Sequence, residues 1–157
     1  MRQEKMISYT QALATLFRHA TPTATTTKPL LDALGHIAAR EVVSAIPVPS
    51  FRNSAMDGFA VVSSQIAGAS EKHPISLTIE TSLAAGDAAP IGQRETATHI
   101  MTGAVVPVPY DAVVPVELVT IDGDRVTFTA PARVNDHIRH AGEDVACGQV
   151  MLRKGAC

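Results

Sequence analysis

The chain has 157 residues, of which 46% are hydrophobic but only 4% aromatic, and it contains no tryptophan. This length suits one compact domain or two small ones, and the core must be built from Ala, Val, Leu and Ile. The formal net charge is −2 and no basic block is present, which argues against nucleic-acid binding because that function needs a clustered cationic surface.

The sequence also argues against export and membrane insertion. The N-terminus lacks the apolar core of a signal peptide, and no run approaches the roughly 18 apolar residues of a membrane span. Cys147 and Cys157 match no zinc-binding spacing and suit free thiols in a reducing compartment. We therefore expect a cytoplasmic protein with neither a membrane nor a nucleic acid as partner.

A helix is predicted over residues 8–20, the stretch SYTQALATLFRHA. Ser8 is a favourable N-cap, and Gln11 three residues later completes a capping box. Apolar residues then recur at steps of three and four, which predicts one apolar face. This face consists of Ala12, Leu13, Leu16, Phe17 and Ala20.

A linker and a second, shorter helix are predicted next. Residues 21–29 are rich in Thr and Pro without periodicity, which is typical of a linker. Residues 29–40 have the pattern of a helix, with Pro29 near its first turn. Gly35 is expected to end this helix in a left-handed conformation.

Short extended segments dominate the chain beyond Arg40. Residues 73–83 alternate apolar and polar side chains, as a half-buried strand does. Asp122 and Gly123 lie between two β-rich arms and predict a tight hairpin. The further strand-like segments are 41–46, 96–109, 111–121 and 148–156. Helices followed by many short strands, without alternating βαβ units, predict a β-rich α+β fold.

Two polar residues stand beside small residues in short loops. Asp57, in NSAMDG, is either a turn residue that bonds its own backbone or an acid presented to a ligand. Thr102, in IMTGA, is either an ordinary strand exit or a hydroxyl that receives an oxyanion together with neighbouring N–H groups.

A third candidate region is the stretch HIRHAGED. Glu143 and Asp144 either hold a divalent cation through oxygen ligands or form a solvated loop. His137 and His140, followed by Glu143, could bind a metal. A nearby glycine disfavours a helix there and Arg139 disfavours a cation, so surface histidines are the preferred interpretation.

Three long stretches together resemble a known family. They are PLLDALGHIAAREVVSAIPVPSFRNSAMDGFAV at 29–61, IMTGAVVPVPYDAVVPVE at 100–117 and IRHAGEDVACGQVMLRKGA at 138–156. In this order and at these separations they resemble the N-terminal region of the MoeA/gephyrin family, the molybdopterin molybdenumtransferases. The resemblance covers nearly the whole chain, from about Ile7 to its end.

The resemblance implies a reaction and its cofactors. Members of the family insert molybdenum from molybdate into adenylylated molybdopterin, with release of AMP, in the last step of molybdenum cofactor biosynthesis. Mg²⁺ is the expected metal of the complete enzyme, because a hard cation held by carboxylates offsets the charges of molybdate and phosphate. This chain alone is expected to bind neither Mg²⁺ nor molybdate tightly.

The resemblance also assigns site residues. The catalytic positions of the three motifs match Asp57, Thr102 and Asp144. The expected substrate-binding residues are Ser54, Gly103, Arg139 and Glu143. No residue of this chain is assigned as a metal ligand. The usual family pattern F-D-N-S-A-M-D-G-Y-A is altered here, since Arg52 and Phe59 replace the first Asp and the Tyr.

The family's N-terminal region consists of two nested subdomains with irregular, bifurcated β-sheets. The resemblance therefore predicts an outer subdomain of residues 1–48 and 138–157, which carries the short helices, and an inserted mixed α/β subdomain of residues 49–137. Complete relatives continue into a pterin-binding domain and a C-terminal β domain, and their active cleft forms between two subunits. We therefore expect a homodimer in which this chain supplies one wall of the site and the pterin-binding domain supplies the other.

Two other classes of function stay open. The chain could be a dimerisation or interaction module that keeps the family fold without catalysis. A small metal-binding protein that uses His137, His140 and Glu143 is the third hypothesis.

Overall fold

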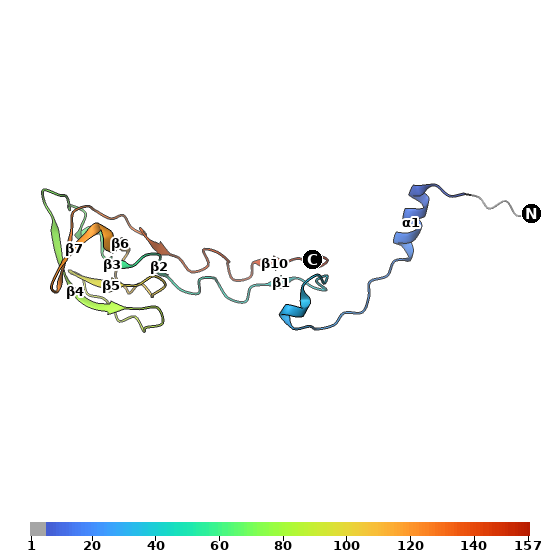
Figure 1. Cartoon of the computed structure of the whole chain (residues 1–157), viewed down its shortest axis with the longest axis horizontal. Coiled ribbons are helices and arrows are strands. Elements are labelled where there is room, and N and C mark those ends of the chain that lie inside the picture. The colour runs from blue at the N-terminus through green and yellow to red at the C-terminus, as the bar shows by residue number, and fades with distance from the viewer. Residues whose placement is uncertain (1–5) are drawn as a thin grey trace, which may run out of the picture. The chain divides into compact units, whose positions relative to one another are not determined.

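The computed structural model describes residues 6–157, so the first five residues of the predicted outer subdomain lie outside it. The described chain is mostly β structure with one α-helix (Figure 1), as the predicted β-rich α+β class requires. The chain divides into an N-terminal unit, formed by the segment up to Arg40 with Arg153–Cys157, and a sheet unit, Glu41–Leu152. The predicted nested subdomains have other boundaries and stay a prediction. No helix among the described residues is long and apolar enough to cross a membrane.

The N-terminal unit contains the predicted capped helix. Helix α1 spans Tyr9–His19, and both halves of the capping box are present. The Gln11 amide donates to Ser8 Oγ at 3.2 Å, and the Ser8 amide donates to Gln11 Oε1 at 3.0 Å. None of the side chains of α1 is buried, so the predicted apolar face is exposed.

The second helix is much shorter than predicted. Only Leu30–Ala33 is helical, as the 3-10 turn η1, and Leu34 has already returned to ψ 131°. The four residues Leu30–Ala33 form too few hydrogen bonds to offset the free-energy cost of nucleating an α-helix. Gly35 does take the predicted left-handed conformation, with φ 77°. Two backbone hydrogen bonds of 2.8 Å then tie Ala38 to the C-terminal segment.

The sheet unit is built on a six-stranded sheet of order β6-β3-β5-β4-β8-β7. Neighbouring strands are antiparallel except β4 and β5, which are parallel. The strand predicted over 73–83 is β4, in which Leu77 is buried and the flanking isoleucines are half-buried. The strands are β3 (Gly58–Val61), β4 (Ile75–Leu83), β5 (Thr96–Ile100), β6 (Ala112–Pro115), β7 (Val119–Asp122) and β8 (Arg125–Phe128), with the 3-10 turns η2 (Ser63–Gln65) and η3 (Val116–Leu118).

The predicted hairpin connects β7 and β8, but its loop is displaced by one residue. Asp122 pairs with Arg125, so the loop consists of Gly123 and Asp124. Gly123 has φ 57° at the first loop position, where a type II′ turn requires positive φ. Asp122 therefore belongs to the strand and the glycine opens the turn.

Apolar side chains cover both faces of the sheet. Because side chains alternate along a strand, Phe59 and Ala60 of β3 enter different clusters. One cluster comprises Phe59, Val61, Ile66, Ala69, Leu77, Ala97, Ala112, Val114, Val126 and Phe128. The other comprises Ala60, Val62, Leu83, Ile100, Ala104, Val106, Tyr110, Val113 and Ile138. Strand β3 is thus buried on both faces, which gives a rigid support to the residue that precedes it, Asp57.

A narrow antiparallel ribbon is formed by residues 41–54 and 138–152, which lie side by side (Figure 1). Strand β1 (Val42–Val43) pairs with β10 (Val150–Leu152), and β2 (Asn53–Ser54) pairs with β9 (Ile138–Arg139). An isolated bridge between Val48 and Val145 lies between these pairs. All side chains of β1 and β10 are exposed although they are apolar.

Candidate functional site

Asp57 and Thr102 are in direct contact, although 45 residues separate them along the chain. The Thr102 amide donates to Asp57 Oδ1 at 2.7 Å, and the Thr102 hydroxyl donates to the same oxygen at 2.8 Å. Both residues are exposed. The amide and hydroxyl of Thr102 are thus bonded to the carboxylate of Asp57, and the predicted binding of an oxyanion ligand by Thr102 stays a prediction.

The register of the sheet explains how the two residues meet. Strands β3 and β5 are antiparallel with Gly58 opposite Ile100, so the residue before β3 faces the residues after β5. A Cβ at Gly58 would lie only 2.1 Å from the carbonyl oxygen of Val114. Only glycine therefore permits the close approach of β3 to β6 directly after Asp57.

A tight turn presents the two donors of Thr102 together. The Ala104 amide donates to the carbonyl oxygen of Met101 at 3.0 Å. Gly103 occupies the third position of this turn with φ 84°, the conformation that a type II turn requires there. The small residues of the MTGA motif thus aim the amide and the hydroxyl of Thr102 at one point.

The hydrogen bonds from Thr102 keep Asp57 ionised. The bond from the Thr102 amide, followed by the bond from its hydroxyl, lowers the pKa of Asp57 below its ordinary value of 3.8. Partial desolvation opposes this shift, and the electrostatic effect of His99 adds a smaller lowering of the Asp57 pKa.

Ser54 connects this turn to the ribbon. Its amide donates to Ala104 O at 2.9 Å, and its carbonyl oxygen accepts from the Gly103 amide at 2.8 Å. On the other side Ser54 pairs with Ile138. Its side chain is fully buried, and its hydroxyl donates to Met56 O at 2.6 Å. Substrate binding by Ser54 and Gly103 stays a prediction, since these polar groups are already bonded within the chain.

Arg139, Glu143 and Asp144 form a second polar group, here called the Arg139 cluster. Arg139 Nη2 lies 2.5 Å from Asp144 Oδ2, and Arg139 Nε lies 3.5 Å from Glu143 Oε1. The hydrogen bond to Asp144, together with its charge, raises the pKa of Arg139. The exposed fractions of these side chains are 39% for Arg139, 45% for Glu143 and 50% for Asp144, so solvent reaches the whole cluster.

The backbone places the Asp57–Thr102 pair and the Arg139 cluster on neighbouring segments. The turn at 101–104 bonds to Ser54, and the adjacent Asn53 pairs with Arg139 across the ribbon. Within the described residues, no hydrogen bond or ion pair joins the pair to the cluster. Convergence of Asp57, Thr102 and Asp144 on one ligand therefore stays a prediction.

The described residues do not make a metal site by themselves. Across residues 6–157, no group of three or more His, Cys, Asp or Glu side chains is arranged to hold a metal ion. Mg²⁺ prefers several oxygen ligands in octahedral geometry, and the Asp57–Thr102 pair offers one carboxylate. The Mg²⁺ expected for the complete enzyme does not fit these residues alone.

The hypothesis of a metal site at His137, His140 and Glu143 is wrong. Glu143 Oε2 accepts a hydrogen bond from the backbone amide of His140 at 2.9 Å, and its other oxygen faces Arg139. Both histidines are exposed, in agreement with the preferred interpretation as surface residues.

Two residues near the site have positions that the sequence did not predict. His99, on β5, contributes a small electrostatic lowering of the pKa of Asp57. The sequence signal for His99 is its position on the strand that leads into the MTGA motif. Arg52, which replaces an Asp of the family pattern, donates through Nη2 to Tyr110 O at 2.8 Å. It thereby holds the loop before β6, which explains how a cation is accommodated there.

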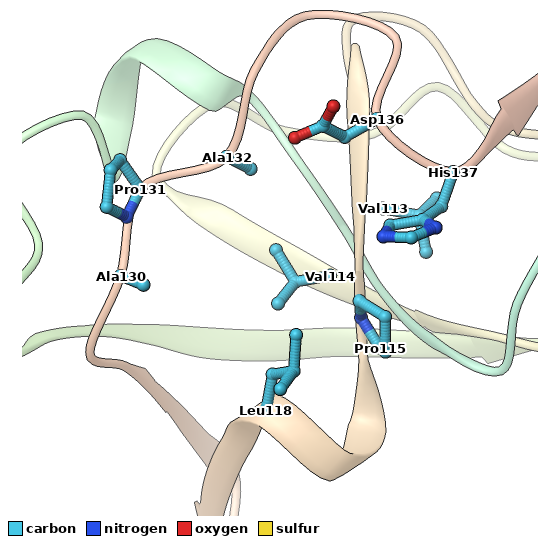
Figure 2. Close-up of a pocket in the computed structure, with 9 residues that line it drawn as sticks. All are labelled: Val113, Val114, Pro115, Leu118, Ala130, Pro131, Ala132, Asp136 and His137. Carbon is cyan, nitrogen blue, oxygen red and sulfur yellow. The ribbon is translucent and has the colours of Figure 1, made fainter.

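A small hollow lies elsewhere on the sheet unit (Figure 2). Its volume is ≈ 80 Å³, well below the several hundred Å³ of sites for drug-sized ligands. Asp136 and His137 contribute its polar side chains, and the remaining lining residues are Val113, Val114, Pro115, Leu118, Ala130, Pro131 and Ala132. None of the predicted catalytic or substrate-binding residues lines it.

The family model described as "MoeA N-terminal region (domain I and II)" matches residues 7–157. Among relatives, the chain is 41% identical over 130 residues to Molybdopterin molybdenumtransferase 2 of Mycobacterium tuberculosis, covering 82% of this chain and 32% of that protein. It is 39% identical over 139 residues to the Molybdopterin molybdenumtransferase of Haemophilus influenzae, covering 86% of this chain and 33% of that protein.

A solved structure shares the fold. The crystal structure of the molybdopterin biosynthesis MoeA protein from Pyrococcus horikoshii OT3 matches with a TM-score of 0.90 at 32% sequence identity. The match covers 96% of this chain and 40% of that protein. The chain thus spans about a third of the length of the relatives named above, and up to 40% of the solved structure.

Proposed function

This chain belongs to the MoeA family and corresponds to the family's N-terminal region. On that premise we propose that it supplies one wall of the site of a molybdopterin molybdenumtransferase. The complete site would insert molybdenum from molybdate into adenylylated molybdopterin. Relatives that carry the name molybdopterin molybdenumtransferase support a role in molybdenum cofactor biosynthesis. The other wall would come from a pterin-binding domain.

The contact between Asp57 and Thr102 is the observation that carries the proposal. It joins two separate sequence motifs into one exposed polar surface. Two donors of one residue fix the position of this surface carboxylate, as a ligand-binding group requires. We infer that the arrangement serves a ligand.

Each residue has a role that its geometry allows. Asp57 is ionised at neutral pH, and its Oδ2 atom has no hydrogen-bond partner among residues 6–157. That oxygen can accept a hydrogen bond from the substrate while Thr102 fixes the carboxylate. Arg139 is a half-exposed cation aligned by two carboxylates, which suits it to contact a phosphate or molybdate oxygen.

Exposure is the reason for proposing that the site is shared. Asp57, Thr102 and Asp144 are all exposed. Charged groups act most strongly on a substrate when water is excluded, so a second protein surface must close over these residues. The closing surface would be the pterin-binding domain of a partner subunit.

A homodimer is the second part of the proposal, and the exposed ribbon supports it. Val43 and Val150 lie opposite each other on β1 and β10, and they are 51% and 42% exposed. Isolated two-stranded ribbons are marginally stable in water, and adjacent exposed apolar residues mark interaction surfaces. The same feature would serve the alternative function, a dimerisation module without catalysis.

A chimera tests the proposal. In it, this chain is followed by the part of the Haemophilus influenzae relative that lies beyond the matched region. We expect the isolated chain, supplied with adenylylated molybdopterin, molybdate and Mg²⁺, to form no active cofactor, and the chimera to form it. Cofactor formation by the isolated chain would refute the shared site, and a folded but inactive chimera would favour the dimerisation module.

A further inference from the structure

His99 occupies a defined place beside the Asp57–Thr102 pair. It pairs with Phe59 across β3 and β5, and with Ser82 across β4 and β5. Gly58 pairs with Ile100, so Asp57, which directly precedes β3, lies near His99 in the register of these two strands.

Two contacts fix the orientation of the imidazole ring. Ser82 Oγ lies 3.0 Å from His99 Nδ1, and the ring packs on Phe59 with centroids 5.2 Å apart at an interplanar angle of 40°. Phe59 is 1% exposed, whereas His99 is only partly buried. The ring is thus anchored on its Nδ1 side, and its Nε2 atom has no hydrogen-bond partner among residues 6–157.

The charge of Asp57 gives the unbonded Nε2 atom of His99 a role in binding an anion. An anionic ligand that approaches Thr102 meets the negative carboxylate of Asp57. Both ion pairs of the described residues involve Arg139, and neither includes Asp57. His99 is therefore a cation-capable side chain placed to offset the charge of Asp57.

We propose that His99 is a further substrate-binding residue of this site, whose Nε2–H donates to a tetrahedral oxyanion held beside Asp57 and Thr102. Ser82 is then a positioning residue, because it acts only through the ring. The inference rests on the proposed function. It adds His99 as a hydrogen-bond donor to which the family resemblance assigned no role. The shared chemistry is that of molybdate and of the phosphate of a nucleotide ester.

Nitrogen NMR of the wild-type chain tests this directly, without risk of misfolding. Sodium molybdate and sodium phosphate are titrated separately to millimolar concentration, and the side-chain ¹⁵N signals of all histidines are followed. We expect a saturable shift of His99 Nε2 with at least one anion, and no such shift at the exposed, distant His73. The anion that saturates at lower concentration identifies the source of the oxyanion. Absence of any saturable shift at His99 overturns the inference.

Kinetics of the chimera separate this inference from the function on which it rests. His99→Gln should raise the apparent KM for the oxyanion substrate by about tenfold, the effect of losing one charged hydrogen bond. His99→Arg, which keeps a cation and donors, should restore most of that loss. Ser82→Ala should give a smaller rise in KM. If Asp57→Asn abolishes activity but His99→Gln leaves KM unchanged, only the inference about His99 is wrong. If Asp57→Asn is also fully active, the proposed function is wrong as well.

Discussion

Thr102 holds a single oxygen of Asp57 with two donors, its amide at 2.7 Å and its hydroxyl at 2.8 Å. The contact converts two motifs that are distant in the sequence into one structural feature. The other oxygen of Asp57 has no hydrogen-bond partner among residues 6–157, and the residue is exposed, which is why we place a ligand there.

Thr102→Val should raise the pKa of Asp57 part of the way toward its ordinary value. The substitution removes the hydroxyl donor, while the amide, which is the larger cause of the lowered pKa, remains. The pKa of Asp57 in the folded chain lies below its ordinary value of 3.8. Ionised Asp57 therefore stabilises the folded state at pH values above 3.8. This contribution is lost as the pH falls from 3.8 to the folded-state pKa. The Thr102→Val variant should lose part of this pH dependence of the free energy of unfolding.

Carbon NMR of the Asp57 carboxyl during an acid titration measures this shift. Thr120→Val, at an exposed position on β7, is the matched control and should leave the pKa of Asp57 unchanged. An identical pKa in the wild-type chain and in Thr102→Val would mean that the hydroxyl does not bond to Asp57 in solution.

Gly58→Ala should destabilise the sheet unit by about 3 kcal/mol, the upper part of the usual cost of overpacking. The new methyl group would lie 2.1 Å from the Val114 carbonyl oxygen, and backbone in the centre of a sheet cannot move aside. Chemical denaturation measures the free energy of unfolding. Gly68→Ala is the control, since a Cβ there meets nothing within 4 Å. Equal stabilities of the two variants would contradict the packing described for β3.

Arg139→Gln and Asp144→Asn should each lower the activity of the chimera without altering its folding. Ion pairs on the surface contribute little to stability because water screens them, and this cluster is exposed. The measurement is molybdenum insertion together with the thermal midpoint. Arg153→Gln, in the N-terminal unit, should change neither. The contrary result is a lowered thermal midpoint together with an unchanged activity per folded molecule. That result would mean that the Arg139 cluster has a purely structural role.

Val43→Lys should convert a dimer of the chain into a monomer. The charged side chain would enter the exposed apolar ribbon, where a buried charge without a partner is strongly unfavourable. Light scattering after size-exclusion chromatography gives the mass of each species. Thr120→Lys, an exposed substitution away from the ribbon, should keep the wild-type mass. A wild-type chain that stays monomeric at high concentration would refute the homodimer as a property of this region.

Local signals in the sequence predicted local structure well. Ser8 and Gln11 define the start of α1 because the capping box involves only neighbouring residues. The alternation in 73–83 identified β4 because one of its faces is buried. The loop at Gly123 was misplaced by one residue, since the residue that opens the turn depends on which residues pair across the hairpin.

The arrangement of the site could not be derived from spacing. The contact of Asp57 with Thr102 depends on the register of β3 and β5. The pairing of Asn53 with Arg139 joins two segments that precede and follow the six-stranded sheet in the sequence. These are long-range pairings that periodicity does not encode. Resemblance to a family supplied Asp57, Thr102 and Asp144, but not His99, whose importance depends on strands that flank it on both sides.

Asp57→Asn in the chimera tests the central claim most directly. The substitution keeps the shape of the side chain and the oxygen that Thr102 contacts, and it removes only the charge. We predict that molybdenum insertion falls by roughly 100-fold, the effect of losing one aligned electrostatic group in an active site, while the thermal midpoint stays at the value of the unsubstituted chimera. Insertion at the unsubstituted rate would contradict the claim that this chain supplies a catalytic wall.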